Sequence, residues 1–248
     1  MTRPPSAIDL GDLFRLNPAL DRPALARQFV EQGERIQIND ILSPESAARL
    51  YQILGQQTPW GIAYYDGAHH FIRREEIAAK KPDELAAINS RLMARARHDY
   101  SYFYFCYPML QAYLEQWQPD HLLMRFLEFL NSAPMLDLIR EISGLAAIIK
   151  ADAQATFYSQ NHFLLHHRDE VEKEHRRLAY VFGFTPEWRT DWGGYLNFFD
   201  ERGDITWGLI PRFNVLNLFA TRHPHAVGQV APFAGAPRLS ITGWYRDQ

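Results

Sequence analysis

From Ala147 onward, the chain is a succession of short apolar or alternating segments separated by turn residues. Successive segments lie too close together for a crossover helix, so the strands that they predict must pair mostly antiparallel. A sandwich or a jelly roll satisfies this condition. The predicted strands span residues 147–151, 153–158, 178–184, 195–199, 204–210, 214–220, 226–230 and 238–245.

The chain before Ala147 carries helical signals instead. Ser43 is a suitable N-cap for a helix over Ser46–Leu54. An apolar pattern of helical period covers residues 121–142 and is interrupted near Ser132–Pro134. Gly144 follows as a helix-ending residue. The two parts of the chain therefore differ in the type of structure that they predict.

These patterns predict a mainly β protein with a helical N-terminal part, built as a double-stranded β-helix (jelly roll) flanked by helices. We expect an N-terminal arm at residues 1–30 and a single domain at 31–248. Within that domain, the helical support spans about residues 31–146 and the jelly-roll core about 147–246. A chain of 248 residues is long enough to bury a substantial core.

Composition limits the partners that we expect. The chain has 26 Lys and Arg against 29 Asp and Glu, a net charge of −3, which argues against nucleic acid or an acidic membrane surface. Cys106, the single cysteine, can form neither an internal disulfide nor a cysteine-based zinc site. The N-terminus does not resemble a secretory signal and no apolar run is long enough to cross a bilayer, so we expect a soluble cytoplasmic protein.

His167-Arg168-Asp169 is the only His-x-Asp motif in the chain. On a strand, residues i and i+2 point to the same face, so this imidazole and carboxylate could hold one metal ion together. A third ligand from another strand would complete the two-histidine, one-carboxylate triad of non-haem iron enzymes. A solvated polar turn explains the tripeptide equally well.

Two later residues extend the motif. His225 opens a predicted strand 58 positions after His167, and Arg238 opens another strand 13 residues later. On that last strand, Arg238, Ser240 and Thr242 share one face. An arginine beside a hydroxyl suits a carboxylate, although Arg238 taken alone could be a surface charge at a strand start.

The order of these residues resembles the 2-oxoglutarate and iron(II)-dependent oxygenases. Trp192-Gly-Gly-Tyr-Leu and Pro211-Arg-Phe-Asn, which lie between Asp169 and His225, add to the likeness. It is strongest to the prolyl-hydroxylase-like branch, including the group that hydroxylates a proline of a ribosomal protein. The resemblance covers about Ala151–Tyr245 and extends weakly to Arg35–Leu54.

The resemblance implies a role for each matched residue. His167, Asp169 and His225 would be the iron ligands. Arg238 would bind the distal carboxylate of 2-oxoglutarate, and Ser240 would be a second contact. Tyr158 matches a tyrosine whose hydroxyl reaches the same carboxylate, or else it is an aromatic residue of the core.

The chain departs from the branch at one position. Gly183 aligns with a tyrosine that the branch often carries, and Tyr180, three residues away, should face the opposite side. We expect His166 to face away from the metal, and His223 is the alternative third ligand.

Two aromatic segments have open roles. Trp188 and Trp192 could line a substrate rim, and the segment Trp60–Phe71 could be a lid over the iron or an ordinary hairpin.

The resemblance implies hydroxylation of an unactivated C–H bond with Fe(II), 2-oxoglutarate and O2, and with ascorbate as an optional reductant. The substrate it favours is a prolyl residue in a peptide or protein. A free amino acid or small metabolite is the alternative substrate, and a non-catalytic jelly-roll binding module or a cupin-like metal enzyme that does not use 2-oxoglutarate is an alternative type of protein. The oligomeric state stays open.

Overall fold

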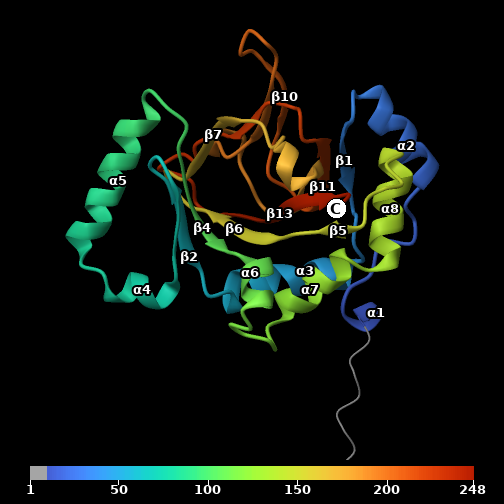
Figure 1. The fold of residues 1–248 in the computed structure, drawn as a ribbon, viewed down its shortest axis with the longest axis horizontal. Helices are drawn as coiled ribbons and strands as arrows, with labels where there is room; N and C mark the ends of the chain where they lie inside the picture. The colour runs from blue at the N-terminus through green and yellow to red at the C-terminus, as the bar shows by residue number, and fades with distance from the viewer. Residues whose placement is uncertain (1–9) are drawn as a thin grey trace, which may run out of the picture.

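The computed structural model describes residues 10–248 and shows one strongly curved β-sheet with helices packed around it (Figure 1). All pairings between its named strands are antiparallel. The strands are β1 (Arg35–Asn39), β2 (Gly61–Tyr65), β3 (His69–Ile72), β4 (Tyr102–Tyr107), β5 (Lys150–Ala151), β6 (Gln154–Tyr158), β7 (Phe163–His167), β8 (Arg176–Phe184), β9 (Leu196–Phe199), β10 (Ile205–Leu209), β11 (Phe213–Ala220), β12 (His225–Val227) and β13 (Arg238–Arg246).

The sheet folds into two walls that face each other across a cavity. The first wall has the order β1-β11-β8-β13-β6-β4, and the second continues it as β7-β12-β9-β10. The walls join where Tyr102 of β4 lies opposite Leu164 of β7. We call them the long wall and the short wall. This arrangement is the jelly roll that the closely spaced strand segments predicted.

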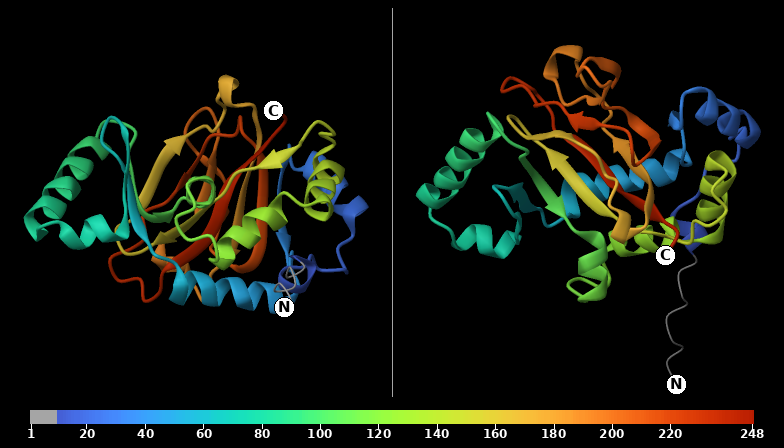
Figure 2. Two further views of the ribbon diagram at one scale, coloured as in Figure 1. Left: turned by 60° about the horizontal axis from the view of Figure 1, so that its bottom comes forward. Right: turned by 45° about the horizontal axis from the view of Figure 1, so that its top comes forward.

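Helices cover the outer face of the long wall and its two ends (Figures 1 and 2). Leu50 and Phe126, from two of these helices, share a buried cluster with Phe182 of β8 and Ile241 of β13. The helical elements are α1 (Leu10–Leu13), α2 (Arg22–Glu31), α3 (Pro44–Gln52), η1 (Ile53–Gln57), α4 (Arg74–Ala79), α5 (Pro82–Ala96), α6 (Met109–Leu114), α7 (Leu122–Leu130), α8 (Ala133–Ser143), η2 (Glu172–Glu174) and η3 (Thr190–Trp192).

The helix boundaries follow the local sequence signals. The Ser43 hydroxyl accepts a hydrogen bond from the backbone N–H of Ser46, which caps α3. The expected interruption near Ser132–Pro134 separates α7 from α8. Gly144 ends α8 with φ of +72°, a left-handed conformation that glycine adopts without strain.

The described part of the expected N-terminal arm packs into the body of the molecule. Phe14 and Phe29 are buried in the main core cluster, and α2 packs against α8. Residues 1–9 of the expected arm lie outside the described residues. Residues 10–30 therefore contribute apolar side chains to the main core of the molecule.

Two strands were missed by the sequence analysis. The aromatic stretch after Tyr100 forms β4, whose Phe103 and Phe105 face outward while Tyr102 and Tyr104 line the cavity. The other is β7, which carries His167 at its end. Both lack a clear apolar–polar alternation, because aromatic residues occupy both faces of β4 and histidines end β7.

The segment Trp60–Phe71 forms a hairpin that belongs to the sheet. Its first strand, β2, pairs with both β3 and β4. Ile88 and Leu92 of α5 cover its outer side in a small apolar cluster. The ordinary-hairpin interpretation therefore describes this segment, and its exposed His69 also lines the cavity.

Candidate active site

The cavity between the two walls has a volume of about 670 Å³. Its lining from the long wall follows the strand period, since Arg238, Ser240, Thr242 and Trp244 of β13 all face it. The intervening residues of β13 face the helix-covered core. Both observations agree with the shared face expected from the sequence.

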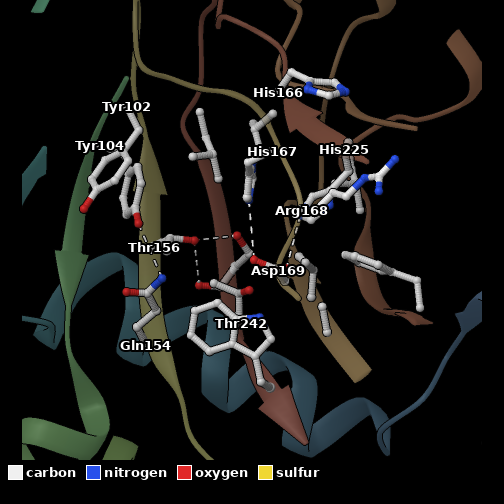
Figure 3. A pocket seen from close by; sticks show the side chains of 18 of the residues that line it. Tyr102, Tyr104, Gln154, Thr156, His166, His167, Arg168, Asp169, His225 and Thr242 are labelled. Atoms are coloured by element: carbon white, nitrogen blue, oxygen red, sulfur yellow. Dashed lines mark hydrogen bonds and ion pairs between the residues drawn. The ribbon is translucent and has the colours of Figure 1, made fainter. Parts of the chain in front are cut away.

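Three potential metal ligands meet at the short wall. One ligand atom each from His167, Asp169 and His225 lies within 4.8 Å of the others, and among residues 10–248 this is the group that could hold a metal ion. Nε2 of His167 is 3.5 Å from Asp169 Oδ1, and Nε2 of His225 is 3.3 Å from Asp169 Oδ2. Figure 3 shows the three side chains converging on one point.

Backbone contacts orient both imidazoles. Nδ1 of His167 donates to the carbonyl of Leu165 at 2.8 Å, and Nδ1 of His225 donates to the carbonyl of His223 at 2.9 Å. A carbonyl only accepts, so Nδ1 carries the proton and each neutral imidazole keeps its Nε2 lone pair. Two lone pairs and a carboxylate then face one point, an arrangement that suits a cation.

Asp169 is placed by tertiary contacts. His167 is the last residue of β7 and Asp169 lies beyond the strand end, where its backbone N–H donates to Thr221 O. The same-face argument for a continuous strand therefore does not explain this pair. Burial opposes ionisation, but the imidazoles of His167 and His225, which donate to the carboxylate when protonated, hold the pKa of Asp169 well below its usual range.

The other histidines point elsewhere. His166 packs against Phe199, with ring centroids 5.2 Å apart, and it is directed away from the cluster (Figure 3). Nε2 of His223 donates to the carbonyl of Gly33, outside the cluster. His223, the alternative third ligand, is therefore not positioned to be one.

Arg238 lies at another part of the same cavity. It is 5% exposed, and none of the acidic side chains that the structure describes lies within salt-bridge distance of its guanidinium. Burial lowers its pKa, but an arginine stays charged in proteins. Because an unpaired buried cation is costly, this position favours an anionic ligand.

Hydroxyl groups surround Arg238. Its guanidinium carbon lies 5.0 Å from the ring centroid of Tyr158, the residue of β6 that pairs with Arg238. Two residues further along β13, on the same face, the hydroxyls of Ser240 and Thr156 are 2.7 Å apart. Thr156 was missed because its strand showed no motif, and only the register places it beside Ser240.

The structure explains why position 183 is a glycine. Gly183 pairs with Ser240 of β13 and Val215 of β11. A Cβ at this position would lie 2.6 Å from the carbonyl oxygen of Arg212, so no larger side chain fits without movement. Tyr180 faces the opposite side, as expected, and its hydroxyl donates to Asp152 O.

The two tryptophans proposed for a rim lie outside the cavity lining. Trp188 and Trp192 contact each other edge to face at 5.4 Å and pack against a buried cluster. The cavity lining includes Trp244, Arg176 and Glu174 instead. The Arg176 guanidinium lies 3.6 Å from the Trp244 ring centroid and pairs with Glu174.

A jelly roll with a two-histidine, one-carboxylate cluster is typical of non-haem iron oxygenases. Residues 153–246 match the 2OG-Fe(II) oxygenase superfamily, a segment that includes all four of His167, Asp169, His225 and Arg238. Residues 153–246 are therefore similar to the 2OG-Fe(II) oxygenases, in agreement with the resemblance that the motif order indicated.

Two kinds of relative extend this comparison. Prolyl 3-hydroxylase OGFOD1 of Mus musculus is 32% identical over 114 residues, which are 43% of this chain. The matched part is 20% of that relative, so the chain spans about a fifth of its length.

Solved structures share the fold. An oxidoreductase of the 2OG-Fe(II) oxygenase family from Burkholderia pseudomallei has a TM-score of 0.60 at 14% identity, covering 95% of this chain and 94% of its own. A prolyl hydroxylase from Trichoplax adhaerens, in complex with a hypoxia inducible factor peptide fragment, has a TM-score of 0.50 at 17% identity, covering 91% and 89%.

Proposed function

We propose that this protein is an Fe(II)- and 2-oxoglutarate-dependent dioxygenase that hydroxylates a prolyl residue in a peptide or protein. The observation that carries the proposal is the pairing of two features in one cavity. One is the convergence of two imidazole lone pairs and a carboxylate, and the other is a buried arginine without an acidic partner among the side chains that the structure describes.

His167, Asp169 and His225 would hold the iron. Their donor set of two neutral nitrogens and one carboxylate suits Fe(II) and leaves coordination positions for other ligands. Bound iron would supply the oxygen chemistry, in which substrate, 2-oxoglutarate and O2 give hydroxylated substrate, succinate and CO2. The protein's own contribution is to fix the ligands and shape the cavity.

Arg238 would bind the distal carboxylate of 2-oxoglutarate through parallel N–H donors. Ser240 and Tyr158 are the further contacts that we propose on the same wall. Thr156 shares a hydrogen bond with Ser240, so this hydroxyl pair offers a donor where the glycine at 183 offers none. These hydroxyls would take the place of the tyrosine that related enzymes carry.

The prolyl substrate rests on relatives. The mouse relative is a prolyl 3-hydroxylase, and the Trichoplax structure contains a peptide. A net charge of −3 also gives no support for a nucleic-acid substrate. Among residues 10–248 no helix is long and apolar enough to cross a membrane. A reducing compartment such as the cytoplasm would preserve both Fe(II) and the free thiol of Cys106.

The first experiment needs no substrate. Fe(II) and then 2-oxoglutarate are added to the protein without oxygen, and the visible charge-transfer band of the chelate is recorded. We expect a band in the wild type, none in His167→Ala, and a weaker one in Arg238→Ala at limiting 2-oxoglutarate. Folded wild-type protein without a band would contradict the proposal.

The substrate is tested separately. Succinate formation is measured with proline-containing peptides, with the same peptides carrying alanine for proline, and with free L-proline. Stimulation by the proline peptides alone supports prolyl hydroxylation in a chain. Stimulation by free proline alone would indicate a free amino acid substrate instead.

A further inference from the structure

Five tyrosines form a continuous chain of ring contacts, and four of them line the cavity. From one end to the other they are Tyr158, Tyr104, Tyr102, Tyr100 and Tyr65, which we call the tyrosine chain. Neighbouring ring centroids lie 4.9, 5.2, 6.0 and 5.1 Å apart. Such separations are within the range of direct aromatic contact.

The tyrosine chain contacts the three potential metal ligands through one ring. The ring of Tyr100 lies 5.7 Å from the ring of His167. On β4, Tyr102 and Tyr104 line the cavity, whereas Phe103 and Phe105 face outward and Tyr107 belongs to the helix-covered core. Packing alone does not require a phenol at Tyr102 and Tyr104, because phenylalanine serves at Phe103 and Phe105 of the same strand.

Within the tyrosine chain, Tyr102 is the member whose hydroxyl is hydrogen-bonded to a basic side chain. The Tyr102 hydroxyl lies 2.9 Å from Nδ1 of His69, and it donates when that nitrogen is unprotonated. His69 is exposed and sits in the same cross-strand row, opposite Tyr65, which in turn lies opposite Tyr102. A proton can therefore leave Tyr102 for a solvent-accessible imidazole.

The two ends of the chain are electrostatically unlike its middle. The guanidinium carbon of Arg238 lies 5.0 Å from the ring centroid of Tyr158, and that of Arg95 lies 5.3 Å from that of Tyr65. A cation over a ring attracts its π electrons and makes their removal harder. Oxidation of the chain would therefore localise on Tyr102.

We propose that the tyrosine chain is a protective redox relay. When oxygen is activated without substrate, Tyr102 would supply electrons to the metal site and His69 would accept the proton of Tyr102. This inference rests on the proposed function. In such a cycle one oxygen atom enters succinate, and the other must be reduced to water by two electrons and two protons.

The electron and proton go separate ways from Tyr102. Tyr102 gives one electron toward the metal site through Tyr100 and transfers its O–H proton to Nδ1 of His69, leaving a neutral tyrosyl radical. A one-electron reductant of the ascorbate class restores the electron, and His69 returns the proton. Two such passes supply both electrons, and solvent supplies the two protons of the water.

The test mixes the Fe(II) and 2-oxoglutarate complex with oxygen in the absence of substrate. Freeze-quenched samples are examined by electron paramagnetic resonance, and succinate formed before inactivation is counted. We expect a tyrosyl radical in the wild type, its loss in Tyr102→Phe, and several-fold fewer turnovers in that variant. Mass spectrometry should find added oxygen on residues beside the metal ligands of Tyr102→Phe.

Tyr64→Phe is the matched control. Tyr64 also stacks on a histidine, with its ring 4.6 Å from that of His70, but on the outer face of the hairpin and outside the tyrosine chain. It should behave as the wild type. Ascorbate should extend the turnovers of wild type and Tyr64→Phe, and not those of Tyr102→Phe.

The outcomes separate the two proposals. Equal radical yield and equal turnover numbers in wild type and Tyr102→Phe would overturn the relay while the charge-transfer band and succinate formation uphold the oxygenase. A Tyr102→Phe defect confined to peptide turnover would also overturn it, since that marks a substrate contact. Absence of the band in the wild type would refute the proposed function itself.

Discussion

The long and short walls hold their functional side chains in different ways. On the long wall, Arg238 and Ser240 are fixed by the register of β13, a nine-residue strand paired on both sides. On the short wall, the ligands lie at the ends of β7 and β12, which have five and three residues. There, individual hydrogen bonds to Leu165, Thr221 and His223 set the geometry.

This difference teaches where function and stability are coupled. A side chain held by strand register cannot move without disturbing its neighbours, so substitutions on the long wall should affect folding as well as binding. A ligand at a strand end can be removed with less effect on the fold. The following predictions test this contrast, beginning with the largest expected effect.

Replacing a short-wall ligand should abolish the metal site and leave the fold intact. We expect His167→Ala to weaken iron binding by more than about a hundredfold, since even an outer contact of a ligand is worth roughly 10–100-fold. Iron titration and circular dichroism measure the two properties. His166→Ala is the matched control and should bind iron normally, and equal losses in both variants would refute the assignment.

Replacing Arg238 should separate binding from stability on the long wall. Arg238→Met should weaken 2-oxoglutarate binding by roughly 10–100-fold, which corresponds to about 1.5–3 kcal/mol for charged hydrogen bonds. It should also raise the melting temperature of the ligand-free protein, because it removes a buried cation that lacks an acidic partner among the described side chains. Unchanged affinity in an anaerobic titration would argue against the carboxylate site.

Lowering the pH should destabilise the fold through His162, a buried residue near the junction of the two walls. His162 lies between β6 and β7, its ring 4.7 Å from those of both Phe103 and Phe105, and burial lowers its pKa to about 4. In the unfolded chain, His162 binds a proton below its ordinary pKa of 6.5, whereas in the folded chain it stays neutral down to about pH 4. The free energy of unfolding therefore falls as the pH is lowered from 6.5 to 4.

The contribution of His162 to this fall is about 3 kcal/mol. Urea unfolding of the metal-free protein across this pH range measures it, with His162→Gln as the comparison. The two proteins should differ in slope below pH 6.5 and run parallel above it. Parallel profiles throughout would show that folding does not lower the pKa of His162.

The smallest effect concerns packing in the long wall. Gly183→Ala places a Cβ 2.6 Å from Arg212 O and 2.8 Å from Val215 Cγ2, so we expect a loss of about 1–3 kcal/mol in chemical denaturation. Gly55→Ala is the control, since its Cβ meets nothing within 4 Å. Equal stabilities of Gly183→Ala and the wild type would show that Arg212 and Val215 move aside at little cost.

Much of the fold could be inferred from the sequence, because it depends on local rules. Ser43, the interruption near Ser132–Pro134 and Gly144 set helix boundaries through capping and backbone conformation. The period of two in β13 divided Arg238 and Ser240 from Leu239 and Ile241 before any contact was known. The order of the ligand motifs likewise indicated the family.

Other features depend on which segments meet. The sequence around β4 and β7 carries no regular alternation, so their roles as wall and ligand strand appear only in the assembled sheet. Thr156 beside Ser240 and His69 beside Tyr102 are joined by register between strands far apart in the chain.

The sequence by itself determined the local conformations, the antiparallel character of the C-terminal half and the kinds of ligand available. Only the tertiary structure decided that Asp169, beyond its strand, meets His167 and His225, and that Arg238 is buried with no acidic partner in the described part of the structure. The physical reason is range. Backbone dihedrals and side-chain period act over a few residues, whereas strand register and burial depend on packing across the whole chain.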